Sequence, residues 1–203
     1  GDYGLLDAII DSRESLEMAL YPDEFEKNFG EGEEQVCLEK DNETLKLQGQ
    51  IDMILSSTNK EEFAILDTKT GSKLPTGPDL KRYDSLQLGI YYLAYTHLNP
   101  HKIGRGGIIW HLNKAQKATQ KLLFCTKEAK EETFEVGRKR PFILSDDYFD
   151  NLKTVLFEIK NKILNNQFQA IANDNETEEI KKRKQQCRFC SLKASCRFKE
   201  RFA

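Results

Sequence analysis

The spacing of apolar residues changes near residue 36, and this change limits the folds that the chain can adopt. From Val36 onward apolar and polar residues alternate in three segments, 36–39, 45–55 and 62–67, which short polar turns connect. Alternation with a period of two is typical of β-strands. Because strands so close in sequence favour antiparallel neighbours, we expect an antiparallel meander in this region.

Segments with helical spacing flank these strands. Apolar residues between 5 and 20 form a helix-like stripe, residues 80–98 are apolar and aromatic at helical spacing, and Ser145 is a good N-cap for a helix over 146–165. Two further strands are expected at 106–112 and 122–126. This order of elements predicts the α/β class, with a central mixed sheet flanked by helices.

Length and hydropathy exclude several classes of protein. The chain has 203 residues, enough for one sizeable core. No apolar run approaches the length of a membrane helix, and no signal peptide opens the sequence. We therefore expect a cytoplasmic protein with no membrane partner.

Charge is unevenly distributed along the chain. The net charge is −2, yet residues 181–203 contain nine basic side chains and one acidic side chain. A basic tail on an acidic body is expected where one face binds a polyanion such as DNA. The alternative is a solvated, frayed terminus. The candidate DNA-binding residues of this tail are Lys181, Lys182, Arg183 and Lys184.

The five cysteines fall into two groups. Cys37 and Cys125 lie within apolar–polar alternation, where a thiol is commonly a small buried hydrophobe. Cys187, Cys190 and Cys196 lie within ten residues of one another, a spacing that suits a zinc site or an iron–sulfur cluster. Either centre needs a fourth ligand, which is not obvious nearby. Three thiols without metal are the alternative.

Two of the expected strands carry acidic residues that suggest a catalytic site. Asp52 lies between Ile51 and Met53, where an isolated buried carboxylate would be unfavourable. Asp67 and Lys69 are two positions apart and therefore point to the same face of a strand. If the strands pair, the two carboxylates repel each other unless a divalent cation lies between them. A lysine there could orient or deprotonate a water for phosphodiester hydrolysis, whereas the alternative for Asp67 and Lys69 is a surface salt bridge.

A third pair of polar residues follows on the expected helix over 80–98. Gln87 and Tyr91 are four positions apart and so share one helical face. Both can contact a phosphate or the end of a strand. The alternative is an aromatic helix that packs on the sheet with a solvated glutamine.

Taken in order, four motifs resemble a known family. They are Gly-x-Ile-Asp at 49–52, Asp-x-Lys at 67–69, Gln-x3-Tyr at 87–91 and Cys-x2-Cys-x5-Cys at 187–196. This order resembles the RecB-like branch of the PD-(D/E)XK nuclease superfamily. The cysteine spacing is most similar to the AddB-type nuclease domain of helicase–nuclease complexes. The resemblance spans about residues 34–197.

The resemblance implies an architecture as well as an activity. It implies a restriction-endonuclease-like core with a cysteine-containing C-terminal tail. On this basis we expect an N-terminal helical segment over 1–35, a nuclease core over 36–170, and a linker with a basic cysteine-rich tail over 171–203.

The resemblance also implies ligands for Mg²⁺ or Mn²⁺. Asp52, Asp67 and the backbone carbonyl of Thr68 would bind the metal, and Lys69 would position the attacking water. Glu34 is a weaker candidate ligand from an earlier segment.

Further roles follow for the remaining motifs. Gln87 and Tyr91 would hold the site and the DNA backbone. A 4Fe-4S cluster on the three tail cysteines would require a fourth cysteine from outside this sequence. Such a cluster would fasten the tail to the domain and would take no part in cleavage.

Two features depart from the family pattern. Family members carry a histidine on a helix well before Gly-x-Ile-Asp, whereas His97, His101 and His111 all follow that motif here. Members with the cluster also place their first cysteine far upstream, whereas Cys37 lies just before the Gly-x-Ile-Asp strand. Both departures fit a fragment, and both fit a member that has lost the cluster or part of its activity.

These observations lead to one expected function and two alternatives. We expect a divalent-metal-dependent DNA nuclease domain, an exonuclease of a repair or recombination system that works with a helicase subunit or domain. The first alternative is a catalytically incomplete DNA-binding or scaffold module of the same fold, and the second is a zinc-ribbon-like binding protein. The presence of Asp52, Asp67 and Lys69 together favours the enzyme.

Overall fold

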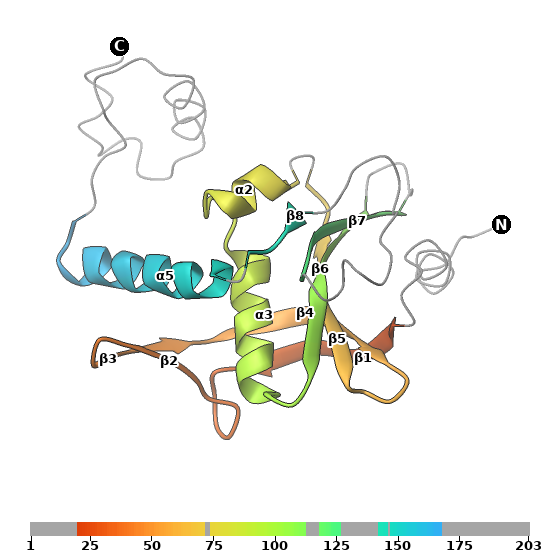
Figure 1. Ribbon diagram of the computed structural model, residues 1–203, viewed down its shortest axis with the longest axis horizontal. Helices are drawn as coiled ribbons and strands as arrows, with labels where there is room; N and C mark the ends of the chain where they lie inside the picture. Colours follow the sequence, from red (N-terminus) through yellow and green to blue (C-terminus); the bar gives the residue numbers. More distant parts are fainter. Residues whose placement is uncertain (1–19, 72–73, 113–117, 127–141, 146, 168–203) are drawn as a thin grey trace, which may run out of the picture. The chain divides into compact units, whose positions relative to one another are not determined.

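The computed structural model describes residues 20–71, 74–112, 118–126, 142–145 and 147–167 (Figure 1). The chain divides into two compact units, residues 1–157 and 158–203. The sheet and the polar contacts described below all belong to the first unit. In the second unit the described residues are 158–167, which include the C-terminal part of helix α5 (Tyr148–Leu164).

A six-stranded mixed sheet forms the centre of the first unit, in the order β1-β4-β5-β6-β7-β8. Its strands are β1 (Leu20–Phe29), β4 (Gly49–Ser57), β5 (Glu62–Lys69), β6 (Ile103–Leu112), β7 (Ala118–Cys125) and β8 (Phe142–Ile143). The β5–β6 and β7–β8 pairs are parallel, and the other pairs are antiparallel. Two further strands, β2 (Val36–Lys40) and β3 (Glu43–Leu47), form a separate antiparallel hairpin. The mixed sheet confirms the expected α/β class.

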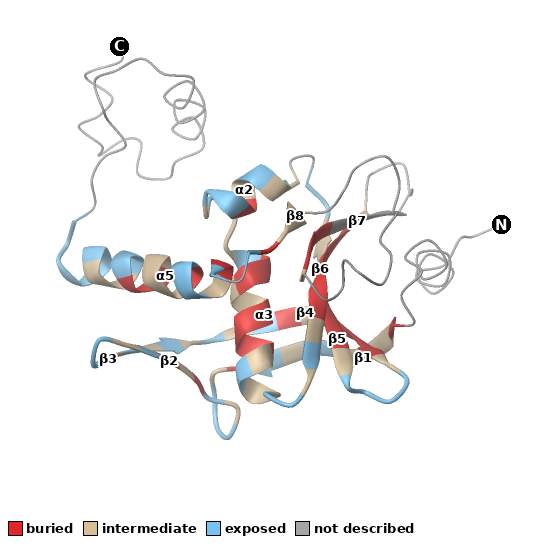
Figure 2. Ribbon diagram, in the orientation of Figure 1, coloured by how far each residue is buried: buried red, intermediate tan, exposed pale blue. Residues whose placement is uncertain are grey.

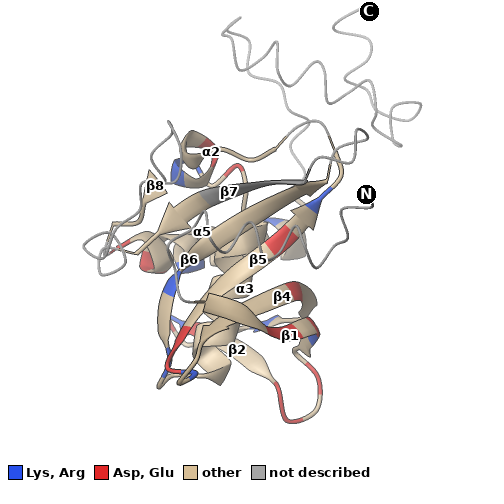
Figure 3. Ribbon diagram, turned by 90° about the vertical axis from the view of Figure 1, so that its right-hand side faces the viewer, with Lys and Arg blue, Asp and Glu red and all other residues tan. Residues whose placement is uncertain are grey.

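The middle of β5 is apolar on both faces of the sheet. β4 and β6 flank this strand, and its central residues are buried on both faces. Phe63 and Ile65 belong to the core cluster that includes residues of helix α3 (Gln87–Leu98), whereas Ala64 and Leu66 belong to the cluster on the opposite face. A strand buried on both faces has a continuous apolar sequence. Figure 2 shows this burial concentrated along the central strands. Charged side chains on β5 are confined to its two ends (Figure 3).

Within the described residues the helices are α2 (Gly77–Lys81), α3 (Gln87–Leu98) and α5 (Tyr148–Leu164). α3 and the first part of α5 contribute to one core cluster. Gly89 permits this close packing, since a Cβ atom there would lie 2.8 Å from a methyl carbon of Leu152. No helix in the described part of the chain is both long and apolar enough to cross a membrane.

The N-terminal helical segment expected over 1–35 needs correction at residues 20–29, which form β1. The alternation typical of a strand is obscured there by a bulge between Pro22 and Glu24. Pairing with β4 determines the conformation, and Leu20 and Phe29 are buried while Phe25 is exposed. Residues 1–19 lie outside the described part of the structure.

The single helix expected over 80–98 is two helices. α2 ends at Lys81, and Tyr83 adopts a positive φ of 57°, which a continuous α-helix does not allow. α2 also begins before residue 80, where the Asp79 carboxylate accepts a hydrogen bond from the Thr76 backbone N–H at 2.8 Å. Similarly, the strand expected over 45–55 is divided between β3 and β4.

Candidate active site

β4 and β5 end their pairing at a fork, and two acidic residues lie there. The antiparallel register runs to Met53 opposite Leu66, so Asp52 and Asp67 are the next residues on the two strands. At this level the Thr68 backbone N–H donates a hydrogen bond of 2.7 Å to Asp52 Oδ2. The fork therefore brings both predicted carboxylates to neighbouring positions at one end of the sheet.

Asp67 is almost fully buried, with 1% of its surface exposed. Lys69 Nζ lies 2.6 Å from Asp67 Oδ2 as an ion pair, but neither carboxylate oxygen accepts a well-directed hydrogen bond from the described residues. Burial raises the pKa of Asp67, the Lys69 ammonium opposes this, and the Asp52 charge adds to it. Lys69 is thus the one positively charged partner of the Asp67 carboxylate among the described residues.

Lys69 connects the fork to α3. Its Nζ donates to Gln87 Oε1 at 2.7 Å, and Gln87 Nε2 donates to the Tyr91 hydroxyl at 3.0 Å. Lys69 ends β5, Gln87 begins α3 and Tyr91 follows one turn later. Phe29 meets the Tyr91 ring edge-on, with 6.1 Å between centroids. The residues of the Asp-x-Lys and Gln-x3-Tyr motifs are thus brought into one continuous set of contacts.

The oxygen atoms at the fork suit a hard divalent cation. Carboxylate and carbonyl oxygens are the ligands that Mg²⁺, Mn²⁺ and Ca²⁺ prefer. Asp67 Oδ1 is buried and has no donor among the described residues, which fits a cation as its partner. In the described part of the chain no three His, Cys, Asp or Glu side chains group together as metal ligands. A cation at the fork would therefore need main-chain oxygens or water to complete its coordination.

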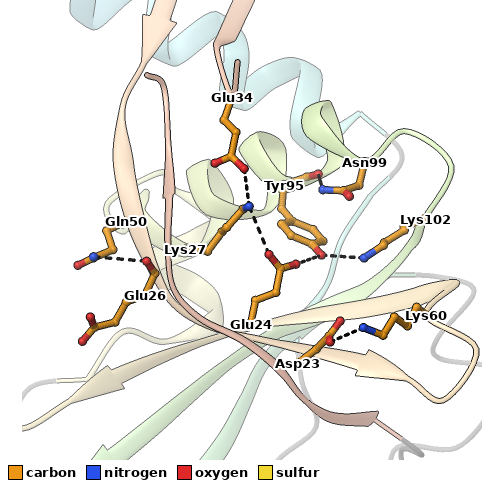
Figure 4. Close-up of polar contacts among 10 residues, drawn as sticks. All are labelled: Asp23, Glu24, Glu26, Lys27, Glu34, Gln50, Lys60, Tyr95, Asn99 and Lys102. Carbon is orange, nitrogen blue, oxygen red and sulfur yellow. Dashed lines mark hydrogen bonds and ion pairs between the residues drawn. The ribbon is translucent and has the colours of Figure 1, made fainter. Parts of the chain in front are cut away.

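The remaining predicted site residues lie elsewhere. Among the described residues Glu34 does not group with Asp52 and Asp67 as a set of metal ligands, and its carboxylate instead lies 2.5 Å from Lys27 Nζ (Figure 4). The tail residues 181–184 and the three tail cysteines lie outside the described residues. Of the two cysteines expected in the core, Cys125 is buried, but Cys37 is only half-buried because Val36 and Leu38 face the core instead.

One contact of the site has no signal in the sequence. The hydrogen bond from the Thr68 N–H to Asp52 depends on where the β4–β5 register ends. Motif spacing gives no information about that register.

Comparison with known families identifies the superfamily of the chain. The family profile of the PD-(D/E)XK nuclease superfamily matches residues 6–197. The chain belongs to the PD-(D/E)XK nuclease superfamily. Membership implies a phosphodiester hydrolase of a superfamily that typically uses a divalent metal.

Comparisons with individual proteins add less. Among solved structures, the crystal structure of SSO0001 matches with 14% sequence identity and a TM-score of 0.40. The match covers 86% of this chain and 59% of that chain, so this chain spans less than two thirds of the length of that protein. No curated protein matches the sequence.

Proposed function

We propose that this superfamily domain is a divalent-metal-dependent exonuclease that hydrolyses DNA phosphodiester bonds. The observation that carries the proposal is the continuous set of contacts from Asp67 through Lys69 and Gln87 to Tyr91, with Asp52 at the same fork. A surface salt bridge between Asp67 and Lys69 would explain neither the buried carboxylate nor its unused oxygen.

The two aspartates are the metal ligands in this proposal. Asp52 and Asp67 lie on neighbouring strands, and the backbone carbonyl of Thr68, the residue after Asp67, is the third candidate ligand. A bound Mg²⁺ or Mn²⁺ would supply Lewis-acid chemistry at the scissile phosphate. Burial of Asp67 keeps competing water away from its oxygens, which strengthens the attraction for a cation.

Lys69 is the residue that positions the attacking water. Its ammonium is held from two sides, by Asp67 Oδ2 at 2.6 Å and by Gln87 Oε1 at 2.7 Å. An ammonium has three N–H donors and the hydrogen bond to Gln87 uses one of them, so an N–H is available to hydrogen-bond a water. The side chain is partly exposed, at 31%, and can reach substrate from the mouth of the fork.

Gln87 and Tyr91 fix Lys69 in place and face the DNA backbone. Because Gln87 accepts from Lys69 through Oε1 and donates to Tyr91 through Nε2, its amide orientation is determined by both neighbours. The second N–H of the Gln87 amide and the Tyr91 hydroxyl proton are suitable donors for a phosphate oxygen.

The narrower assignment rests on the sequence resemblance. The tail spacing of Cys187, Cys190 and Cys196 supports the RecB-like, AddB-type branch and hence a repair or recombination system with a helicase partner. The basic tail would add phosphate contacts, and a 4Fe-4S cluster would need a cysteine from outside this sequence. Both remain proposals.

Cleavage by the Lys69→Ala variant tests the proposed function. Linear and circular DNA are incubated with Mg²⁺ or Mn²⁺, and with a chelator as the metal-free control. We expect the wild type to degrade linear DNA only with metal, and Lys69→Ala to cut at least about 100-fold more slowly, since positioned proton transfer contributes that much or more.

Lys60→Ala is the matched control for this experiment. Lys60 lies just before β5, is 66% exposed and pairs with Asp23 at 2.9 Å, far along the strand from the fork. It should cleave like the wild type. Equal activity of Lys69→Ala and the wild type would refute the role of Lys69. No cleavage by the wild type under any metal would favour the DNA-binding scaffold of the same fold.

A further inference from the structure

His111 lies beside Lys69 on the neighbouring strand of the sheet. The parallel register of β5 and β6 pairs Asp67 with Ile109 and Lys69 with His111. Adjacent strands are about 4.8 Å apart, so the imidazole is one strand away from the fork. The sequence motifs give His111 no role, since it belongs to none of them.

The alternation of β6 determines the direction of His111. Ile109 belongs to the core cluster that contains α3, whereas Ile108 and Trp110 belong to the cluster on the opposite face. Successive side chains of a strand point to opposite faces, so His111 shares the face of Ile109. Lys69 points to this same face, because it contacts Gln87 of α3.

Three neighbouring strands therefore present polar side chains on one face, at one end of the sheet. β4 contributes Asp52, β5 contributes Asp67 and Lys69, and β6 contributes His111. His111 is partly exposed, and its side chain makes no hydrogen bond or ion pair with the other described residues. An exposed imidazole beside a catalytic fork has an N–H available for a ligand.

We propose that His111 donates a hydrogen bond to a non-bridging oxygen of the phosphate adjacent to the scissile one. The inference rests on the proposed nuclease function. The scissile phosphate is engaged at Asp52, Asp67 and Lys69, and His111 is displaced from them by one strand spacing. The imidazole adds its own length to this step of about 4.8 Å, which gives a reach on the scale of the separation between neighbouring phosphates of a DNA strand. The next phosphate is thus within its reach.

Steady-state kinetics on labelled linear DNA test the proposal. One lost phosphate hydrogen bond should raise KM about five- to tenfold in His111→Ala and leave kcat nearly unchanged. His111→Asn keeps an N–H donor and should recover part of the loss. His101→Ala is the matched control, because His101 is exposed near the opposite end of the same strand.

DNA with single methylphosphonate linkages locates the phosphate. Removing one charged oxygen next to the scissile bond should weaken wild-type binding at that position, and this effect should disappear in His111→Ala. Identical methylphosphonate profiles for the two proteins would overturn the proposal. So would a KM equal to that of His101→Ala, or a loss confined to kcat.

The two proposals fail in different ways. Wild-type activity that survives in Lys69→Ala would refute the catalytic fork, whatever His111 does. Activity that depends on Lys69, with unchanged kinetics in a folded His111→Ala protein, would refute the phosphate contact alone. Thermal unfolding of both His111 variants provides the check on folding.

Discussion

Two sets of acidic and basic residues lie on the sheet, one around Asp67 at the fork and one around Glu24 on β1, and they differ in how well the acids are paired. On β1, Glu24 Oε1 accepts a hydrogen bond of 2.7 Å from the Tyr95 hydroxyl, and its other oxygen lies 3.4 Å from Lys27 (Figure 4). The Tyr95 hydroxyl in turn accepts from Lys102 at 2.9 Å. At the fork, Asp67 has Lys69 as its only charged partner among the described residues, and one of its oxygens has no donor there.

The difference separates a structural network from a ligand site. Burial raises the pKa of Tyr95, and the neighbouring Glu24 charge adds to this, so the phenol keeps the proton that it donates. Each group around Glu24 stabilises the others. A buried carboxylate with an unused oxygen instead destabilises the folded chain, and a cation would offset that penalty. The incomplete set is therefore the better candidate for binding a ligand.

Changing one carboxylate to an amide in each set should give the largest difference between the two sets in cleavage and in stability. Asp67→Asn should reduce cleavage at least about 100-fold and weaken Mn²⁺ binding, because it removes a charged metal ligand. Without metal it should raise the free energy of unfolding by about 1 kcal/mol, since a buried charge is removed. Glu24→Gln should keep cleavage and lower the free energy of unfolding by about 1 kcal/mol.

Cleavage assays, Mn²⁺ titration calorimetry and urea unfolding measure these effects. Unchanged Mn²⁺ affinity in Asp67→Asn would refute its role as a ligand. A stability loss in both variants would show that the two sets are equally structural, and the comparison would then fail.

Because the pKa of Asp67 is raised, we expect the free energy of unfolding of the metal-free protein to depend on pH. The unfolded carboxyl titrates near 3.8, and the folded one titrates at higher pH because it is buried. The folded state therefore holds the proton more tightly, so stability falls as pH rises from about 3.8 through the folded pKa. Mn²⁺ affinity should rise over the same window, since the cation competes with this proton.

Urea unfolding of the wild type and Asp67→Asn across this pH range isolates the contribution of one residue. The difference between their free energies of unfolding should grow as pH rises without metal and shrink when Mn²⁺ is added. A difference that does not vary with pH would mean that the Asp67 pKa is not raised.

Motif spacing predicted the grouping at the fork because the geometry involved is local. Two positions along a strand fix a shared face for Asp67 and Lys69, and four positions along a helix do so for Gln87 and Tyr91. The placement of His111 was not predictable, because it depends on a parallel register between strands that are far apart in sequence.

Backbone irregularities explain the missed elements. β1 carries a bulge between Pro22 and Glu24, so its sequence lacks the alternation by which the other strands were recognised. The break between α2 and α3 depends on the positive φ of Tyr83, for which an aromatic residue gives no signal. In both cases packing against the rest of the fold determines the conformation.

Removing one hydroxyl from each set should give the smallest changes in stability and cleavage. The two variants should nevertheless rank in opposite order in the two measurements. Tyr95→Phe deletes the donor to Glu24 and the acceptor of Lys102, so it should lower the free energy of unfolding by about 1 kcal/mol and leave cleavage unchanged. Tyr91→Phe deletes a hydroxyl that accepts from Gln87 in an exposed contact, so stability should change by less. Its cleavage rate should fall several-fold, because Gln87 loses one of the two partners that orient it toward Lys69. Urea unfolding and cleavage kinetics on the two variants would show opposite rankings if the sets differ as we infer. If Tyr95→Phe impaired cleavage more than Tyr91→Phe, the catalytic function would have to be assigned to the set around Glu24.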